Sequence, residues 1–186
     1  EDSSMSVFEE RGATAVTFSP DGKYIGTGRG GAPETRLWNR ETGEKLHQFK
    51  ISGALVVAFT PDSKRYIAPS GYRNELEVRE VVSGKLLRKI TTKGIQIVDL
   101  SVSPDGKRLA VTGHNPGVGV WDLETGKQIA SNGSGHDEAV RHMRYSPDGK
   151  RVVTAGMDGR VAVWDASTGE LLQEPLVGSQ NWAGAA

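Results

Sequence analysis

Short apolar runs, separated by polar segments that contain glycine or proline, follow one another along the whole chain. The runs are rich in β-branched and aromatic residues, and none shows a helical 3.6-residue apolar period of useful length. The pattern therefore predicts short β-strands. The first runs contain Val16 and Phe18, Val57 and Phe59, Val98 and Leu100, and Val140 with Met143 and Tyr145, and later runs lie at 24–25, 66–67, 109–111 and 152–153 and at 36–38, 76–78, 118–121 and 161–164.

A tetrapeptide of the type Ser/Thr-Pro-Asp-Gly returns four times, at spacings of 41, 43 and 43 residues. Proline at the second position and glycine at the fourth favour a type I turn. Ser63 replaces the glycine in the second copy, so we expect the least comfortable turn there. A fixed period of this length indicates a repeat architecture. The four copies begin at Ser19, Thr60, Ser103 and Ser146.

A second turn and a fourth apolar run complete each unit. The turns lie at 41–43, 82–84, 124–126 and 167–169, and the runs at 45–50, 85–91, 127–130 and 170–173. A four-stranded unit of this size cannot bury both faces alone, whereas units packed around an axis form a propeller. The fold class predicted is an all-β propeller of four-stranded antiparallel blades, four of them complete, with apolar strands covered on both faces.

The last repeat resembles a WD repeat of the β-propeller superfamily. The resemblance rests on Gly135-His136, the turn at Ser146, Asp158, and Val163-Trp164-Asp165. The third repeat keeps Val120-Trp121-Asp122, the first keeps only the tryptophan, and the second has Arg79-Glu80 instead. The resemblance covers essentially the whole chain.

The resemblance implies a buried hydrogen-bonded chain within one blade, formed by His136, Thr154, Asp158 and Trp164. It also implies that the other repeats retain less of this chain, so the fourth blade should be the firmest. The retained residues are Thr27 and Trp38 in the first repeat and Thr112 and Trp121 in the third, whereas the second has Ala68 and Arg79.

The repeats divide the chain into one propeller region, residues 1–186, with an orphan outer strand at 1–11 and the start of a fifth repeat at 177–186. We expect a fragment of a longer propeller, whose remaining blades come from the same or another chain; a closed four-bladed ring is the alternative. The four blades are expected at 12–51, 52–92, 93–131 and 132–176.

The equal numbers of basic and acidic residues bear on which kind of partner the chain can bind. Lys plus Arg and Asp plus Glu number 23 each, which argues against a nucleic-acid surface. The chain has no cysteine, hence no disulfide or thiolate metal site, and no apolar stretch long enough for a membrane span. The sequence predicts no cofactor, no nucleic acid and no membrane partner, and it leaves the cellular compartment open.

Several motifs imitate chemical sites. Residues 26–31 match G-x-G-x-x-G, but a strand pattern follows where a phosphate site needs a helix, so a flexible loop is expected. His136, Asp158 and Thr154 resemble a nucleophile triad but are expected to be buried. None of the four histidines has a recognisable metal spacing, and His142 is expected to be packed or to line the channel.

The residues expected to meet a partner lie on the loops of one face. They include types that are enriched at interfaces. We expect a non-catalytic scaffold that binds a protein or peptide through this face. The alternatives are an enzyme with a channel-centred site, for which Asp99 stands alone as a carboxylate on an innermost strand, and a structural or sensory appendage of a larger protein. The loop residues are Arg29, Tyr72, Arg73, His114, Asp137, Met157 and Trp182.

Overall fold

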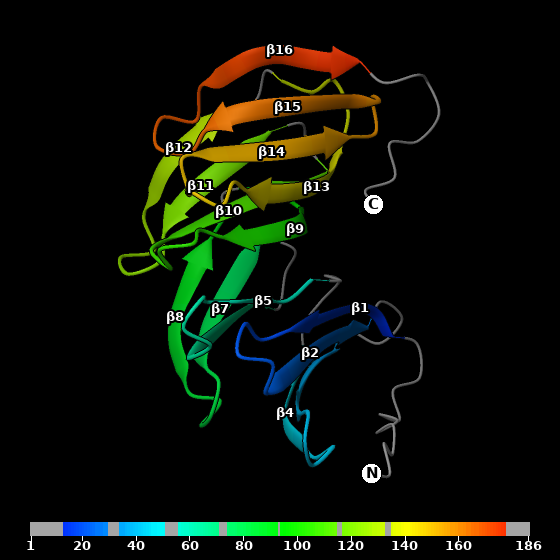
Figure 1. Ribbon diagram of the computed structural model, residues 1–186, viewed down its shortest axis with the longest axis vertical. Coiled ribbons are helices and arrows are strands. Elements are labelled where there is room, and N and C mark those ends of the chain that lie inside the picture. Colours follow the sequence, from blue (N-terminus) through cyan, green and yellow to red (C-terminus); the bar gives the residue numbers. More distant parts are fainter. Residues whose placement is uncertain are drawn as a thin grey trace.

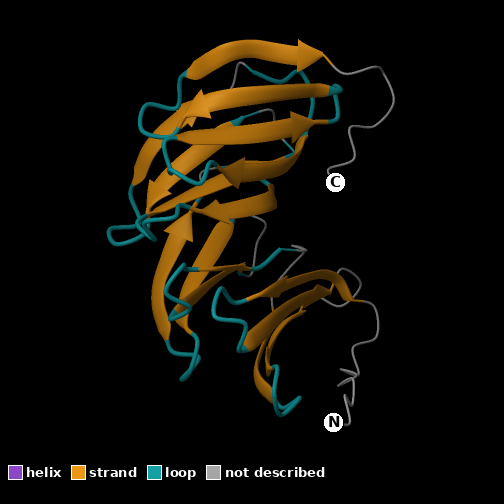
Figure 2. Ribbon diagram, in the orientation of Figure 1, coloured by secondary structure: helices purple, strands orange, loops and turns teal. Residues whose placement is uncertain are grey.

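A computed structural model of the chain describes residues 13–29, 34–50, 56–70, 74–92, 94–114, 117–132 and 135–177. These residues form sixteen strands and no helix. The expected orphan strand and the start of a fifth repeat lie outside them, apart from residue 177. The strands group into four antiparallel four-stranded sheets, in which each strand pairs with its neighbour in the chain (Figure 2). The prediction of four complete four-stranded units is confirmed.

The strand bounds repeat from sheet to sheet. The first sheet holds β1 (Ala13–Phe18), β2 (Tyr24–Arg29), β3 (Glu34–Asn39) and β4 (Lys45–Lys50), and the second holds β5 (Ala58–Phe59), β6 (Arg65–Pro69), β7 (Glu75–Glu80) and β8 (Leu86–Thr91). The third sheet holds β9 (Ile97–Val102), β10 (Arg108–Gly113), β11 (Val118–Asp122) and β12 (Gln128–Asn132), and the fourth holds β13 (Val140–Tyr145), β14 (Arg151–Gly156), β15 (Arg160–Asp165) and β16 (Leu171–Val177).

The sheets follow one another in an open arc, from β1–β4 at one end to β13–β16 at the other (Figure 1). Three apolar cores lie between consecutive sheets, and each draws side chains from both of its neighbours. Burial of such side chains supplies the main force that holds neighbouring sheets together. The largest side chains are Leu37 and Tyr66 between sheets one and two, Ile67 and Trp121 between two and three, and Met143 and Trp164 between three and four.

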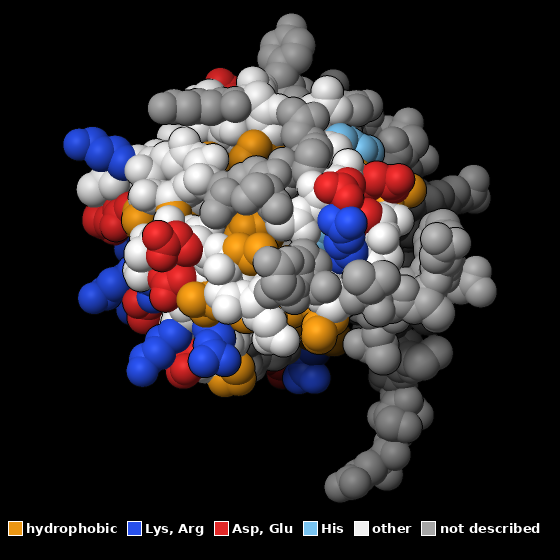
Figure 3. Space-filling model, turned by 90° about the horizontal axis from the view of Figure 1, so that it is seen from above, with side chains coloured by type: hydrophobic (Ala, Val, Ile, Leu, Met, Phe, Trp, Pro, Cys, Tyr) orange, Lys and Arg blue, Asp and Glu red, His pale blue; other side chains and the backbone are white. Residues whose placement is uncertain are grey.

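The expectation that both faces of every sheet are covered is wrong for the first sheet. Val16 and Phe18 on β1 are 69% and 59% exposed, because no described strand packs against that side of β1. Leu172 and Leu176 on β16 also reach the surface at the opposite end of the arc, which Figure 3 views from above. A sheet buries both faces only where it has a neighbour on each side.

The turn after each first strand has the same hydrogen-bond pattern in all four sheets. In the first, the Gly22 N–H donates to the Ser19 carbonyl oxygen at 2.8 Å, and the Ser19 hydroxyl donates to Asp21 Oδ1 at 2.6 Å. The same hydroxyl accepts the Tyr24 N–H, so one serine ties the turn to the next strand. The predicted tight turns are therefore present. Ser63 occupies the glycine position of the second turn with a φ of 57°.

The G-x-G-x-x-G segment is not the loop that we expected throughout. Gly26 to Arg29 belong to β2, and the rest lies outside the described residues. A Cβ on Gly26 would lie 3.0 Å from a Val57 methyl group, so this glycine allows the first two sheets to approach closely. The next described element is β3, a strand, so the described part of the motif lacks the helix N-terminus that a phosphate site requires.

Candidate functional site

A buried hydrogen-bonded chain runs through the fourth sheet. His136 precedes β13, Thr154 lies on β14, Asp158 lies in the following turn, and Trp164 lies on β15. The imidazole lies between the other two polar groups, with Nδ1 3.1 Å from Asp158 Oδ1 and Nε2 2.8 Å from the Thr154 hydroxyl. The Trp164 indole N–H donates to the same hydroxyl at 2.8 Å. The structure thus brings these four residues into one connected network.

Backbone donors hold Asp158 in its ionised form. Burial acts to raise the pKa of this carboxyl, but hydrogen bonds from the Asp137 N–H, the His136 side chain and the Arg160 N–H outweigh burial, so the pKa is lowered. The polar atoms of His136, Thr154 and Trp164 are buried and bonded to one another. A catalytic nucleophile needs contact with substrate, which this geometry does not provide for Thr154.

The first and third sheets differ in whether a threonine lies where its hydroxyl can accept the indole N–H of the tryptophan. Trp38 donates to the Thr27 hydroxyl at 3.1 Å. In the third sheet, our expectation that Thr112 takes the place of Thr154 is wrong by one residue. Thr154 pairs across the sheet with Ala162, and it is Val111 that pairs with the equivalent Gly119. A shift of one residue along a strand reverses the face, so Thr112 points away from Trp121.

Two glycines decide where each tryptophan ring lies. A Cβ on Gly135 would lie 2.3 Å from the Trp164 ring, and a Cβ on Gly119 would lie 2.2 Å from the Trp121 ring. At the repeat spacing, Thr92 stands where Gly135 stands, and Ala162 where Gly119 stands. Each indole therefore occupies the place that the glycine of its own repeat leaves open.

An ion pair replaces the tryptophan in the second sheet. The Arg79 guanidinium lies 2.7 Å from the Glu77 carboxylate, donates to the Gly84 carbonyl oxygen at 2.8 Å, and covers the Phe49 ring with its carbon 4.1 Å from the ring centroid. A guanidinium can stack on an aromatic ring while its edge makes hydrogen bonds. Arg79 thus links the second sheet to the outer strand of the first.

The described loop residues are exposed. His114 follows β10, Asp137 lies in the turn before β13 with its carboxylate 2.7 Å from the Arg160 guanidinium, and Met157 is half exposed after β14. Arg29 ends β2, and its side chain is not described. Tyr72, Arg73 and Trp182 lie outside the described residues. The role of all seven as a partner-binding face stays a prediction.

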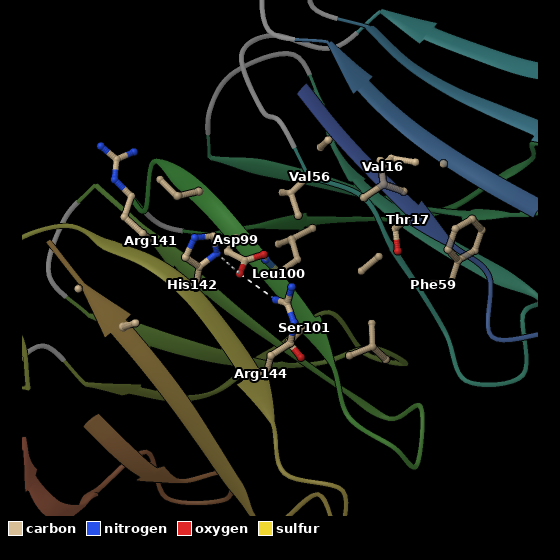
Figure 4. Close-up of a pocket in the computed structure, with 18 of the residues that line it drawn as sticks. Val16, Thr17, Val56, Phe59, Asp99, Leu100, Ser101, Arg141, His142 and Arg144 are labelled. Carbon is tan, nitrogen blue, oxygen red and sulfur yellow. Dashed lines mark hydrogen bonds and ion pairs between the residues drawn. The ribbon is translucent and has the colours of Figure 1, made fainter. Parts of the chain in front are cut away.

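The innermost strands β1, β5, β9 and β13 surround an open hollow of about 1280 Å³, part of which is shown in Figure 4. Asp99 on β9 is buried at its wall. It accepts the Met143 N–H and the Arg144 guanidinium on β13, each at 2.9 Å. As the sequence predicted, Asp99 is the one carboxylate on the described innermost strands, and its described partners are donors rather than a second carboxylate.

Two basic side chains at this wall, those of Arg141 and Arg144, were missed by the sequence analysis. Arg141, His142 and Arg144 on β13 all border the hollow and are exposed. The available signal was a first strand with basic residues at positions where β9 carries Val98, Asp99 and Ser101. His142 lines the hollow, one of the two places expected for it. No group of three or more residues able to hold a metal ion occurs in the described ranges.

Four-stranded antiparallel sheets arranged in series around a hollow define the class of protein: an array of β-propeller blades. The family model described as "WD domain, G-beta repeat" matches residues 126–165, which include β12 to β15. This match, the relatives reported next and the fourfold repetition of the unit support a WD-repeat family for the chain.

Two of the three relatives that follow are named as WD repeat-containing proteins. An uncharacterized WD repeat-containing protein of Deinococcus radiodurans is 32% identical over 142 residues, 63% of this chain and 52% of the relative. Eukaryotic translation initiation factor 3 subunit I of Phaeosphaeria nodorum is 27% identical over 150 residues, 70% and 45%. WD repeat-containing protein 3 of Mus musculus is 27% identical over 109 residues, 59% and 11%. The chain spans about half the length of these relatives or less.

The part of the chain that the structure describes contains no helix that could cross a membrane.

Proposed function

We propose that the chain is a non-catalytic interaction scaffold that presents the loops on one face of its blades to a protein or peptide. The proposal rests on a contrast between polar groups that are buried and bonded to one another and loop residues that are exposed. The buried His136, Thr154, Asp158 and Trp164 bond one another, whereas His114 and Met157 stand exposed on loops at the ends of regular strands. Rigid strands that carry exposed loops are a common arrangement for binding surfaces.

The formal net charge and the name of one relative support a protein partner. The formal net charge is zero, whereas surfaces that bind nucleic acid usually carry a basic excess. One relative is named as a subunit of a translation initiation factor, so that protein works as part of an assembly. We propose the same kind of association for this chain, without a cofactor, and not the same partner.

The alternative is an enzyme with its site in the central hollow. It requires converging carboxylates or histidines with a free face. Asp99 lies at the wall, but its oxygens accept two backbone N–H groups and the Arg144 guanidinium. A carboxylate engaged in this way is already satisfied by structural donors, which favours the scaffold. A substrate-saturable activity that Asp99→Ala abolishes would favour the enzyme instead.

A peptide-display selection against the full chain tests the scaffold. The loop variant His114→Ala/Met157→Ala should lower the affinity of selected peptides at least tenfold. The control Glu41→Ala/Lys127→Ala alters exposed residues of the hairpin turns at the opposite ends of the strands, and should change affinity less than twofold. Failure to enrich any peptide, or equal losses in the two variants, would count against a loop-face scaffold.

A further inference from the structure

We propose that the central hollow binds an extended peptide whose acidic side chains contact β13 and whose apolar side chains pack on β1. This deepens the proposed function, on which it rests, because it names the chemistry of the partner and a contact surface inside the ring of loops. The hollow has two unlike walls. One is basic, formed by Arg141, His142 and Arg144, and the other is apolar and includes Val16 and Val56 (Figure 4). Phe18, on the same strand as Val16, also lines the hollow.

A β-bulge creates the basic wall. Val140 pairs with Gly156 and His142 pairs with Ala155, so Arg141 is the extra residue that the ladder leaves out. The bulge breaks the in-and-out alternation, and Arg141 and His142 are both exposed. The same irregularity in β9 leaves out Val98. The same bulge position therefore holds valine in the third repeat and arginine in the fourth. Bulges often direct side chains toward functional sites.

Asp99 fixes the position of Arg144. Its carboxylate accepts the Met143 N–H and holds the Arg144 guanidinium at 2.9 Å, while 66% of the Arg144 side chain stays exposed. His142 Nδ1 lies 3.9 Å from the same carboxylate. Asp99 offsets one positive charge, and Arg144 Nη1 also donates to the Met143 carbonyl oxygen. The other guanidinium nitrogens of this hollow-lining residue make no hydrogen bond within the described residues. Arg144 is thus positioned to form a charge-assisted hydrogen bond with a second carboxylate.

Arg141 adds a charge that Asp99 does not offset. Figure 4 shows its guanidinium pointing away from Asp99, and no described carboxylate forms an ion pair with it. Two other carboxylates border the hollow. Asp158 is bonded to His136 and to backbone N–H groups, and Glu138 is exposed. The wall at β13 therefore attracts acidic groups, chiefly through Arg141 and Arg144.

The apolar wall decides against nucleic acid as the occupant. Val16 is 69% exposed and Phe18 59%, so apolar surface faces the basic strand across the hollow. A polynucleotide needs a row of cations along its phosphates, which two arginines do not provide. An extended peptide directs alternate side chains to opposite sides, which suits one acidic and one apolar row.

Fluorescence anisotropy on the full chain tests the site. The probe is a labelled peptide of alternating glutamate and leucine between serine ends, and the reference has glutamine for glutamate. We expect the acidic probe to bind at least tenfold more tightly, and Arg141→Gln to weaken it five- to twentyfold. Arg151→Gln removes the same charge from an exposed residue outside the hollow and should change binding less than twofold. Phe18→Ser should weaken both peptides.

Three results would overturn this site. They are equal binding of the acidic and glutamine peptides, no effect of Arg141→Gln in a variant with an unchanged unfolding midpoint, and displacement of the probe by oligothymidylate at equal concentration. Peptides from the display selection separate this proposal from the scaffold. If they lose affinity in the loop variant but not in Arg141→Gln, the scaffold stands and the acidic-peptide site falls.

Discussion

Ser63 occupies a left-handed backbone position that its three equivalents leave to glycine. Its φ is 57°, against 70° at Gly22 and 69° at both Gly106 and Gly149, and it is the one non-glycine residue with a positive φ in the described ranges. Its hydroxyl makes a stabilising contact in return, because it accepts a hydrogen bond from the Asp21 N–H of the neighbouring sheet at 3.0 Å. Backbone strain and a contact between sheets therefore meet at one residue.

Substitution of Ser63 separates these two effects. Ser63→Ala keeps the strain and removes the hydrogen bond, so it should lower the free energy of unfolding by about 1 kcal/mol. Ser63→Gly removes the same bond but relieves strain of about 1–2 kcal/mol, so it should be close to neutral. Urea unfolding midpoints give the order. An alanine variant as stable as the glycine variant would show that the turn is not strained.

Asp165 shows how a turn sets the pH dependence of stability. Hydrogen bonds from the Ser167 hydroxyl and from the Thr168 and Ser167 N–H groups lower the pKa of its carboxyl to about 2. The unfolded value is about 3.9, so the folded pKa is the lower of the two. The stabilisation is therefore complete above the unfolded pKa and is lost as the pH falls through the folded one. Asn39 fills the equivalent position in the first repeat and accepts two similar backbone N–H groups.

Asp165→Asn should weaken the acid sensitivity of the protein. Between pH 4 and pH 2 the unfolding midpoint of the variant should fall less than that of the unaltered chain, because the variant has no carboxylate to protonate at this turn. Unfolding in urea at several pH values measures the slope. Glu41→Gln, which removes the same charge from an exposed side chain, is the control and should leave the slope nearly unchanged. Parallel slopes for Asp165→Asn and the unaltered chain would contradict the assignment.

At the scale of the elements, the position of a glycine decides where the ring of a tryptophan packs. Gly135 precedes β13, Ala162 lies on β15, and the Trp164 ring lies against the glycine. In the third sheet the small residue is Gly119 on the strand itself, and the Trp121 ring lies over it. The same residue type therefore packs in two ways inside one repeat family.

Exchange of the small residues should shift the balance between these placements. Gly135→Ala forces the Trp164 ring to move and should cost about 1–3 kcal/mol. Ala162→Gly alone should cost about 0.5–1 kcal/mol, since glycine weakens a strand. Together they open the placement that Trp121 uses, so the loss in the double variant should be smaller than the sum. Denaturant midpoints and near-ultraviolet circular dichroism test this, and strictly additive losses would contradict it.

At the scale of the whole molecule, apolar cores and a few polar links join the sheets in series. Asp99 links β9 to β13, and the Ser101 hydroxyl accepts the Tyr145 N–H between the same strands. At the turn ends, the Arg108 guanidinium donates to the Gly149 carbonyl oxygen. These links are unevenly distributed, and so is the buried network that only the fourth sheet holds in full among the described residues. We therefore expect uneven stability along the array.

Trp164→Ala and Arg79→Ala compare the fourth and second sheets. Trp164 is 1% exposed, and its removal should cost about 3–5 kcal/mol. Arg79 is partly exposed, and its loss removes charge-assisted hydrogen bonds worth about 1–3 kcal/mol in total. Hydrogen exchange and denaturant midpoints should show the larger loss for Trp164→Ala. The reverse order would refute the idea that the tryptophan network makes the fourth sheet the firmest.

The sequence by itself determined the strands, the turns and their repetition. Strand propensity, a proline with a preset φ and the need for glycine in the left-handed region are local properties, so even the strain at Ser63 could be predicted. The four residues of the buried chain could be named from the resemblance, because the last repeat keeps every position of the motif. Blade boundaries and the loop face stay predictions.

Only the tertiary structure decided which side chains meet across sheets. Thr112 was placed one residue out of register, because the face of a strand residue follows from its pairing and not from its distance to a turn. The partners of Asp99, the exposure of Phe18 and the two tryptophan placements were likewise not predictable. Each depends on contacts between residues far apart in the chain or on the presence of a neighbouring sheet. Local propensity carries no information on either.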